Sequence, residues 1–221
     1  MKGLFITFEG TEGSGKTTQI SMLADRLRSM GHTVRTLREP GGTPIGEEIR
    51  HTLKHSPAND AMTPEAELLL MNASRAQLVR EVIRPALASG EMVLCDRFYD
   101  STVAYQGYGR QLDLQMVKSM IDVAVGDTRP DLTLLFIVPR EVSEARRVAR
   151  QPTLPLAIKR DRMEEADQDF FARVAQGYQA IAAAEPQRVR QFDATGELAT
   201  IEAAIWRLVQ PLVARVEKPR R

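Results

Sequence analysis

Short apolar runs alternate along this chain with longer segments in which apolar residues recur every three to four positions. Runs of the first kind are typical of buried strands, and segments of the second kind are typical of amphipathic helices. We expect strands at residues 4–9, 33–38, 92–95, 132–138 and 188–192. We expect helices at residues 16–30, 45–55, 64–89, 114–125, 141–150, 164–184 and 198–216. This alternation predicts an α/β fold in which helices cover both faces of a parallel sheet.

Glycines mark the ends of three expected helices, at Gly31, Gly90 and Gly126, as left-handed capping residues do. No segment repeats with a fixed period, and no linker rich in proline or glycine divides the chain. With 221 residues, the chain is long enough for one well-buried domain. We therefore expect a single domain over residues 1–221.

The charge balance excludes some classes of partner. Lysine and arginine number 30 against 29 aspartates and glutamates, and the net charge of +1 argues against a protein that coats nucleic acid or an anionic membrane. No apolar run approaches the roughly 18 residues that a membrane span requires. The single cysteine, Cys95, cannot form an internal disulfide. We expect a cytoplasmic protein with neither a nucleic-acid nor a membrane partner.

Residues 10–17 read Gly-Thr-Glu-Gly-Ser-Gly-Lys-Thr and match the phosphate-binding pattern G-x-x-x-x-G-K-T. An apolar run precedes them and an amphipathic stretch follows, which is the context that the pattern requires. The glycines let backbone N–H groups converge on phosphate oxygens, Lys16 brings a cation to the outer phosphates, and the Thr17 hydroxyl can ligate Mg²⁺. The sequence therefore predicts a bound nucleoside triphosphate.

Two polar clusters directly follow expected strands, so they lie at the edge where open α/β sheets bind ligands. The first is Arg38-Glu39-Pro40-Gly41-Gly42-Thr43, whose glycines could also serve only to make turns. The second is Asp96-Arg97, followed by Ser101, Thr102, Tyr105 and Gln106. Asp96 can hold Mg²⁺ through water and Arg97 can bridge two phosphates, although the two could also simply pair with each other.

Two helical segments add candidate ligand-binding groups. Met71 and Arg75 share one helix face and could contact a base, although Met71 alone would equally suit a core. The segment 141–165 carries six basic residues: Arg146, Arg147, Arg150, Lys159, Arg160 and Arg162. Such a run could be a solvated face, but beside a phosphate-binding loop we expect a lid at about 147–163. Arginines on a closing lid stabilise a transferring phosphoryl group and exclude water, which favours a kinase over an ATPase.

Taken together, these motifs resemble the thymidylate kinase family over nearly the whole chain. The resemblance rests on Gly10–Thr17, the stretch from Arg38 to Thr43, Ser74-Arg75-Ala76-Gln77, Asp96-Arg97 with Ser101, Ala104-Tyr-Gln-Gly107 and Arg110, Arg129-Pro-Asp-Leu132, and Asp161-Arg162-Met-Glu164. It implies a P-loop nucleoside monophosphate kinase fold with a five-stranded parallel sheet. It also implies a homodimer that transfers phosphate from ATP to dTMP in the presence of Mg²⁺, giving dTDP.

The resemblance implies roles for individual residues. ATP would be bound by Gly10, Thr11, Glu12, Gly13, Ser14, Gly15, Lys16, Thr17 and Thr18, and Mg²⁺ by Thr17 and Asp96. The acceptor would be bound by Glu12, Glu39, Pro40, Arg50, Met71, Arg75, Arg97, Ser101, Thr102, Tyr105 and Gln106. Among these, Glu12 would lie near the sugar 3′-hydroxyl, Arg97 would hold the acceptor phosphate and Arg75 the thymine edge, while Tyr105 would crowd the 2′ position. The catalytic set would be Lys16, Arg97, Glu12 and a lid arginine, Arg146 or Arg150, because the loop carries no arginine, as in the bacterial subtype.

This chain departs from the family pattern at three places. Met71 stands where the family commonly has a phenylalanine that stacks on thymine, and Ile137 stands where an acidic residue often ends the fourth strand. The lid is also longer than usual, because residues 151–160 precede Asp161. Met71 keeps open a kinase of the same fold for another pyrimidine nucleotide. A P-loop ATPase switch is the further alternative, but the chain lacks a guanine-selecting Asn-Lys-x-Asp stretch and has acceptor-side residues that a switch does not need.

Overall fold

The computed structural model describes residues 3–150 and 168–217. Its sheet has five parallel strands in the order β2-β3-β1-β4-β5. The strands are β1 (Leu4–Gly10), β2 (Val34–Arg38), β3 (Met92–Asp96), β4 (Leu132–Ile137) and β5 (Val189–Asp193). Every strand lies within one residue of its predicted bounds. The predicted five-stranded α/β fold is thereby confirmed.

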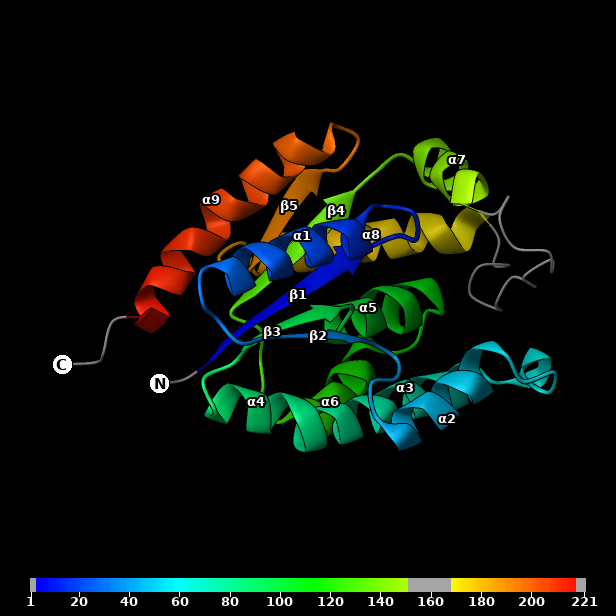
Figure 1. The fold of residues 1–221 in the computed structure, drawn as a ribbon. Coiled ribbons are helices and arrows are strands. Elements are labelled where there is room, and N and C mark those ends of the chain that lie inside the picture. The colour runs from blue at the N-terminus through cyan, green and yellow to red at the C-terminus, as the bar shows by residue number, and fades with distance from the viewer. Residues whose placement is uncertain (1–2, 151–167, 218–221) are drawn as a thin grey trace.

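Helices pack on both faces of this sheet (Figure 1). On one face, α1 (Lys16–Ser29) and α9 (Leu198–Glu217) enclose a core with β1, β3 and β4. On the other face, α3 (Pro64–Leu78), α4 (Arg84–Ala88), α6 (Leu114–Val125) and α8 (Gln168–Ala184) enclose a second core. Outside these layers, α2 (Pro44–Lys54) packs on α3, and α7 (Arg140–Arg150) follows β4. No helix within the described ranges is long and apolar enough to cross a membrane.

The central strand β1 is buried along its whole length and contributes side chains to both cores. Side chains alternate between the two faces of a strand. Leu4, Ile6 and Phe8 accordingly pack with α1 and α9, whereas Phe5 packs with α3 and α8. The same alternation brings the polar side chains of Thr7 and Glu9 to the Phe5 side, where they need hydrogen-bond partners.

Two stretches depart from the predicted helices. The helix expected over 64–89 is divided into α3, a π-helical turn at Val79–Ile83, and α4. Pro85 lacks the N–H that would bond to the carbonyl of Glu81, so an unbroken α-helical ladder cannot form there. In addition, no helix is predicted directly after β3, where the structure has α5 (Tyr99–Thr102) and a π-helical turn at Val103–Gly109.

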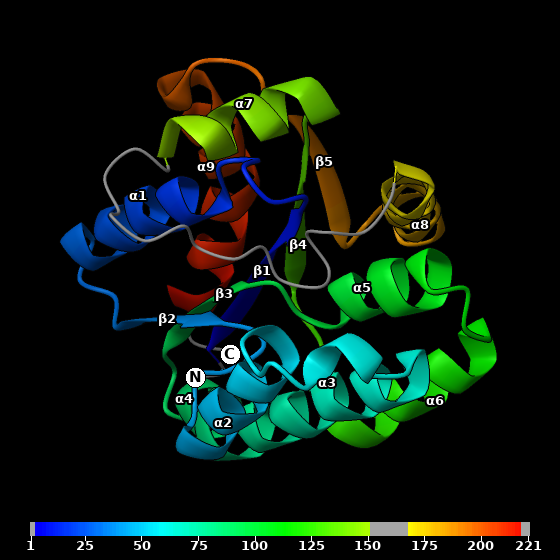
Figure 2. The same ribbon diagram turned by 90° about the vertical axis from the view of Figure 1, so that its right-hand side faces the viewer.

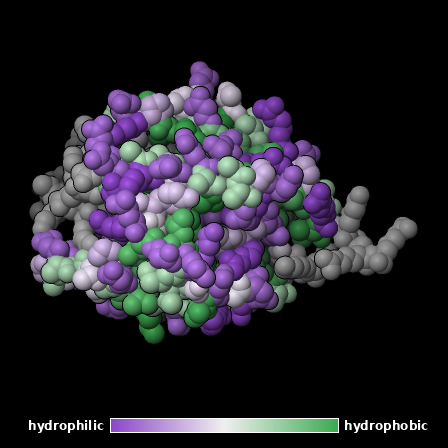
Figure 3. Space-filling model, turned by 180° about the vertical axis from the view of Figure 1, so that it is seen from behind, coloured by the Kyte–Doolittle hydropathy of each residue, from purple (hydrophilic) through white to green (hydrophobic). Residues whose placement is uncertain are grey.

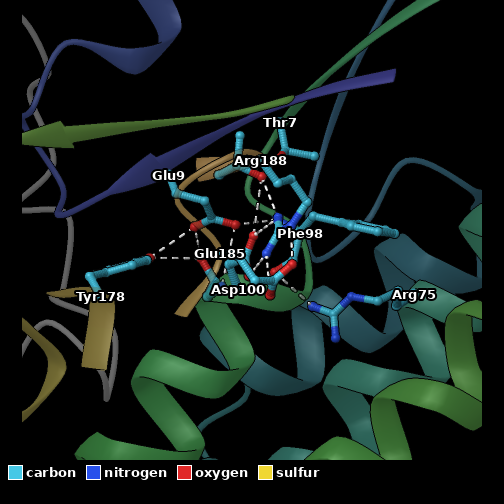
Figure 4. Close-up of polar contacts among 10 residues, drawn as sticks. Thr7, Glu9, Arg75, Phe98, Asp100, Tyr178, Glu185 and Arg188 are labelled. Carbon is cyan, nitrogen blue, oxygen red and sulfur yellow. Dashed lines mark hydrogen bonds and ion pairs between the residues drawn. The ribbon is translucent and has the colours of Figure 1, made fainter. Parts of the chain in front are cut away.

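A polar cluster ties α5 to the sheet (Figure 4). Arg188, which directly precedes β5, donates to both carboxylate oxygens of Asp100, at 2.6 and 2.9 Å. Thr133 on β4 donates to Asp100 at 3.2 Å and hydrogen-bonds Thr7 at 2.8 Å. The Asp100 and Arg188 side chains are only 3% and 12% exposed. One carboxylate therefore joins α5 to β1, β4 and β5.

We expect Asp100→Ala to lower the free energy of unfolding by about 3 kcal/mol or more, because it removes the buried carboxylate that Arg188 contacts at two points. The half-exposed Glu185 is then the remaining carboxylate partner of Arg188. Urea denaturation measures the loss. The control is Asp25→Ala, which removes an exposed ion pair with Arg28 and is expected to change stability by less than about 1 kcal/mol. Equal losses in the two variants would contradict this account of the cluster.

Candidate functional site

A cavity of about 580 Å³ lies at the carboxyl-terminal edge of the sheet. Figure 2 looks onto this edge, with α7 above it and α2 and α3 below it. The loops that follow β1, β2 and β3 meet there because the carboxyl ends of parallel strands share one edge. Helices α2, α3, α7 and α8 complete the wall with side chains such as Arg50, Met71, Ser143 and Phe171. The cavity therefore joins segments that are far apart in the sequence.

The loop after β1 wraps around the ammonium group of Lys16. Gly10, Gly13 and Gly15 have φ angles of 132°, 74° and 93°, which other residues rarely adopt. The Lys16 Nζ donates to the carbonyls of Gly10 and Thr11, at 3.1 and 2.8 Å, and to Ser14 Oγ at 3.3 Å. Burial, with a smaller contribution from Arg97, lowers the pKa of Lys16 to about 7. The loop thus holds a cation that readily exchanges its proton near neutral pH.

Thr17 and Asp96 form a pair of oxygen ligands beside this loop. The Thr17 hydroxyl donates to Asp96 Oδ2 at 3.2 Å. The other carboxylate oxygen, Oδ1, is buried without a hydrogen-bond partner, so it can still act as a ligand. Over residues 3–150 and 168–217, no three acidic, histidine or cysteine side chains gather into a metal site. Mg²⁺ fits the pair, because it is usually held by one or two protein oxygens together with phosphates and water.

Arg97 adopts a left-handed backbone conformation, with a φ of 68°, directly after Asp96. This conformation is uncommon for a residue with a side chain, so the surroundings must hold it. The backbone N–H of Arg97 donates to the carbonyl of Phe8 at 2.9 Å. Its guanidinium lies 3.2 Å from Ser101 Oγ, 3.4 Å from the Tyr178 hydroxyl and 5.2 Å from the Tyr105 ring centre. Arg97 is thereby fixed at both its backbone and its side chain.

A buried carboxylate, Glu9, organises the neighbours of Arg97 (Figure 4). It accepts hydrogen bonds from the backbone N–H of Phe98 at 2.7 Å, from Ser101 Oγ at 2.6 Å and from the Tyr178 hydroxyl at 2.9 Å. Burial, reinforced by the nearby Asp100, raises the pKa of Glu9. The last residues of β1 thus position both α5 and a tyrosine of α8.

The opposite wall carries a buried ion pair between Arg75 and Glu39. Arg75 Nε donates to Glu39 Oε2 at 2.7 Å, and its other nitrogens donate to Asn72 and to the Phe98 carbonyl, at 3.1 and 3.3 Å. Burial raises the pKa of Glu39 to about 7, although Arg75 opposes the rise. Next to this pair, Arg50 donates to the Pro40 carbonyl at 2.9 Å.

Most of the residues predicted from the sequence line this single cavity. They are Thr11, Glu12, Gly13, Gly15, Lys16, Thr17, Glu39, Pro40, Arg50, Met71, Arg75, Asp96, Arg97, Ser101, Tyr105 and Gln106. Gly10, Ser14, Thr18 and Thr102 are not part of its lining, and Thr102 is buried.

The predicted lid arginines are placed only in part. Arg146 does not line the cavity; it donates to the carbonyls of Ala194 and Thr195 at 2.8 and 3.4 Å. The side chain of Arg150 and residues 151–167, which include most of the predicted lid with Lys159, Arg160 and Arg162, lie outside the described part of the chain.

Sequence reasoning missed several residues of the site. Lys54, Arg140, Ser143 and Phe171 line the cavity, and Ser143 donates to the backbone carbonyl of Glu12. The sequence offers a signal for Glu9, because a charged residue follows directly on the mostly apolar run Leu4–Phe8. The role of Tyr178 had none, since its partners lie 77 to 169 positions away in the sequence.

Comparisons with known proteins agree on one family. The family model described as thymidylate kinase matches residues 8–205. The thymidylate kinase of Syntrophotalea carbinolica is 51% identical over 202 residues, which cover 91% of this chain and 93% of that protein. The thymidylate kinase of Alcanivorax borkumensis is 47% identical over 214 residues, which cover 97% of this chain and 99% of that protein. The crystal structure of thymidylate kinase from Ehrlichia chaffeensis superposes with a TM-score of 0.74 at 30% identity, and it covers 95% of this chain and 100% of that one.

The Lys16 pKa of about 7 predicts that ATP binding takes up a proton at alkaline pH. At pH 8 the side chain is mostly neutral before binding, and the phosphates favour its charged form. We therefore expect uptake of up to about one proton, and an affinity that weakens by up to about tenfold for each pH unit above 7. Calorimetry in two buffers with different heats of ionisation measures the uptake.

The matched control is Lys16→Arg, whose guanidinium stays protonated, so neither proton uptake nor a pH-dependent affinity is expected. Identical binding heats for the unmodified protein in the two buffers at pH 8 would show that Lys16 is already charged before ATP binds.

Proposed function

The chain belongs to the thymidylate kinase family, and we propose that it transfers the γ-phosphate of ATP to dTMP, giving dTDP. One observation carries the proposal beyond the family name. A single cavity combines a phosphate-binding loop on one side with two arginines, Arg75 and Arg97, on the other. A protein that only hydrolyses a triphosphate has no need of the second set, whereas a kinase needs both because it binds two substrates.

On the donor side, the loop from Gly10 to Thr18 binds the ATP phosphates. The Lys16 ammonium group contacts the outer phosphates, and the backbone N–H groups of the loop donate hydrogen bonds to the inner ones. Thr17 and Asp96 are the residues that would hold Mg²⁺. When bound, Mg²⁺ offsets the charge of the phosphate oxygens.

On the acceptor side, Arg97 holds the phosphate of dTMP and Arg75 the thymine edge. Met71 packs on the base, and Ser101, Tyr105 and Gln106 line the pocket for the base and sugar. Glu12 lies at the loop position nearest the sugar 3′-hydroxyl, and Tyr105 leaves no room for a 2′-hydroxyl. Glu39, Pro40 and Arg50 form the neighbouring wall. Thr102 is buried and would act on the pocket only through its neighbours in α5.

The chemical step is an in-line transfer between two phosphate oxygens. Such a reaction depends on positioning and on cations near the equatorial oxygens of the moving group. Lys16 and Arg97 supply two of these cations. We assign the third to Arg146 or Arg150 of α7. For Arg146 this role requires its guanidinium to leave the carbonyl of Ala194.

We further propose that the protein acts in the cytoplasm as a homodimer. The single cysteine, Cys95, is buried and free, which suits a reducing compartment. Three large apolar side chains of α3 and α6 are exposed in the single chain: Leu69, Met116 and Val123. Their exposure suits a contact between two copies of the chain.

The function is tested by a coupled ADP-release assay with dTMP, dUMP, dCMP, dGMP and AMP as acceptors. We expect dTMP to give the highest kcat/KM. A higher kcat/KM for another pyrimidine nucleotide would identify a kinase of the same fold with a different acceptor. Steady ATP hydrolysis that no acceptor accelerates would identify an ATPase, and either result overturns the proposal.

Arg97 and Tyr178 give a graded prediction. We expect Arg97→Ala to lower kcat/KM for dTMP by about 10²–10⁴, the effect of removing one electrostatic contact to the transferring group. Tyr178→Phe removes only a hydroxyl that supports Arg97, so we expect a loss of about three- to tenfold. Steady-state kinetics with dTMP as the varied substrate measures both losses.

Tyr108→Phe serves as the control, since it removes a tyrosine hydroxyl from a side chain that does not line the cavity. A loss for Tyr178→Phe no larger than that for the control would remove Tyr178 from the support of Arg97.

A further inference from the structure

The side-chain amide of Gln106 is held by a buried carboxylate that does not itself line the cavity. Gln106 lies in the π-helical turn at Val103–Gly109 and forms part of the cavity wall. Its Nε2 donates to Glu67 Oε1 at 2.8 Å. The two residues are only 1% and 2% exposed, so water does not compete for this bond. Glu67 sits in the first turn of α3, which fixes its backbone.

Arg110 completes the arrangement around Glu67. Its Nε and Nη2 lie 3.3 and 3.1 Å from the two carboxylate oxygens, and its guanidinium stacks over the Phe170 ring at 4.7 Å. As the ionised partner of a guanidinium, the Glu67 carboxylate can only accept hydrogen bonds. The amide nitrogen of Gln106 must therefore face Glu67, which leaves the carbonyl oxygen, Oε1, for a molecule in the cavity.

The face of α3 that carries Glu67 also carries a hydrogen-bond donor, Arg75, whereas Gln106 supplies an acceptor. Arg75 lies eight residues after Glu67, with Met71 midway, and these spacings place all three on one side of the helix. A guanidinium can only donate hydrogen bonds, whereas Oε1 of Gln106 can only accept them. The base pocket thus offers a donor from Arg75 and an acceptor from Gln106.

This pattern separates the pyrimidine bases. Thymine and uracil carry an N3–H donor next to a C4 carbonyl acceptor, so each can satisfy both groups of the pocket. Cytosine reverses the pattern, with an acceptor at N3 and an amino donor at C4. An amide free to turn over would present its NH₂ group to the cavity in one of its two orientations. That orientation would satisfy the N3 acceptor of cytosine, although the C4 amino group would still face the donors of Arg75.

We propose that Glu67 is a positioning residue that sets the base selectivity of the acceptor site by fixing the orientation of the Gln106 amide. The inference rests on the proposed function, in which the acceptor is dTMP. Glu67 does not touch the base; it acts through Gln106, and its ion pair with Arg110 holds the carboxylate in place.

The test is Glu67→Gln in the full-length enzyme. The new amide can donate to Gln106 Oε1 as well as accept from Nε2, so both orientations of Gln106 become available. We measure kcat/KM for dTMP, dCMP and N3-methyl-dTMP, which lacks the N3–H donor. We expect the preference for dTMP over each of the other two to fall about tenfold, the effect of one hydrogen bond, with KM for ATP unchanged.

The chain offers a matched control. Gln77 Nε2 donates to Glu81 Oε2 at 2.7 Å in the same kind of pair, but on an exposed part of the neighbouring helical segment. Glu81→Gln makes the same chemical change away from the cavity, and we expect it to leave both preferences as they are. An effect of the same size in both variants would overturn the proposal.

Other outcomes are equally decisive. A merely structural role for Glu67 predicts that Glu67→Gln lowers kcat/KM for all three acceptors by one common factor, and unchanged preferences overturn the proposal. If Glu67→Gln does not fold, Gln106→Met tests the same reading: both preferences must fall, and unchanged preferences reject it. Failure of the proposed function is distinct, because it shows already in the unmodified enzyme as a lack of preference for dTMP.

Discussion

The buried carboxylate of Glu9 is the interaction on which the architecture of the site depends. It is the next-to-last residue of the central strand, and three groups that lie elsewhere in the sequence donate hydrogen bonds to it: the Phe98 N–H, Ser101 and Tyr178. Through these bonds one strand end fixes the start of α5 and the face of α8, and between them lies Arg97. A carboxylate buried in this way is costly unless its lone pairs are filled, so the surroundings have little freedom to rearrange. The strained backbone of Arg97 persists because this network holds it.

Two buried charged groups of the cavity, Glu39 and Lys16, are only partly compensated by their neighbours. Glu39 is buried and still leaves Oε1 without a partner, and Lys16 bonds to neutral carbonyls rather than to a carboxylate. Burial shifts the pKa of each toward 7, upward for Glu39 and downward for Lys16. Burial penalises the charged form in both cases; Glu39 already has Arg75 as a partner, whereas the charged form of Lys16 gains one when a phosphate binds. The free energy that a phosphate recovers by pairing with such preorganised cations is available for binding, with little reorganisation of the protein.

The sheet and the phosphate-binding loop could be predicted from the sequence, because each depends on a pattern of consecutive residues. Buried parallel strands read as continuous apolar runs, and the loop has a fixed pattern of glycines. The sequence did not predict α5, whose four residues include only one apolar side chain, or the break near Pro85. It also failed for partners brought together by tertiary contact. Glu67 and Gln106 are 39 positions apart, and Tyr178 lies 169 positions from Glu9. For Arg146 and Arg150, helical spacing could not reveal that the loop after β5 offers carbonyls to Arg146.

The first turn of α7 rests directly on the phosphate-binding loop. Ser143 donates to the carbonyl of Glu12, and a Cβ atom at Gly13 would come within 2.5 Å of the Ser143 carbonyl oxygen. No side chain fits between the two backbones, so the loop and the helix are in direct backbone contact. The loop therefore cannot move toward α7 unless the helix moves as well. A nucleotide that moves the phosphate-binding loop would thus act directly on α7, the helix that carries Arg146.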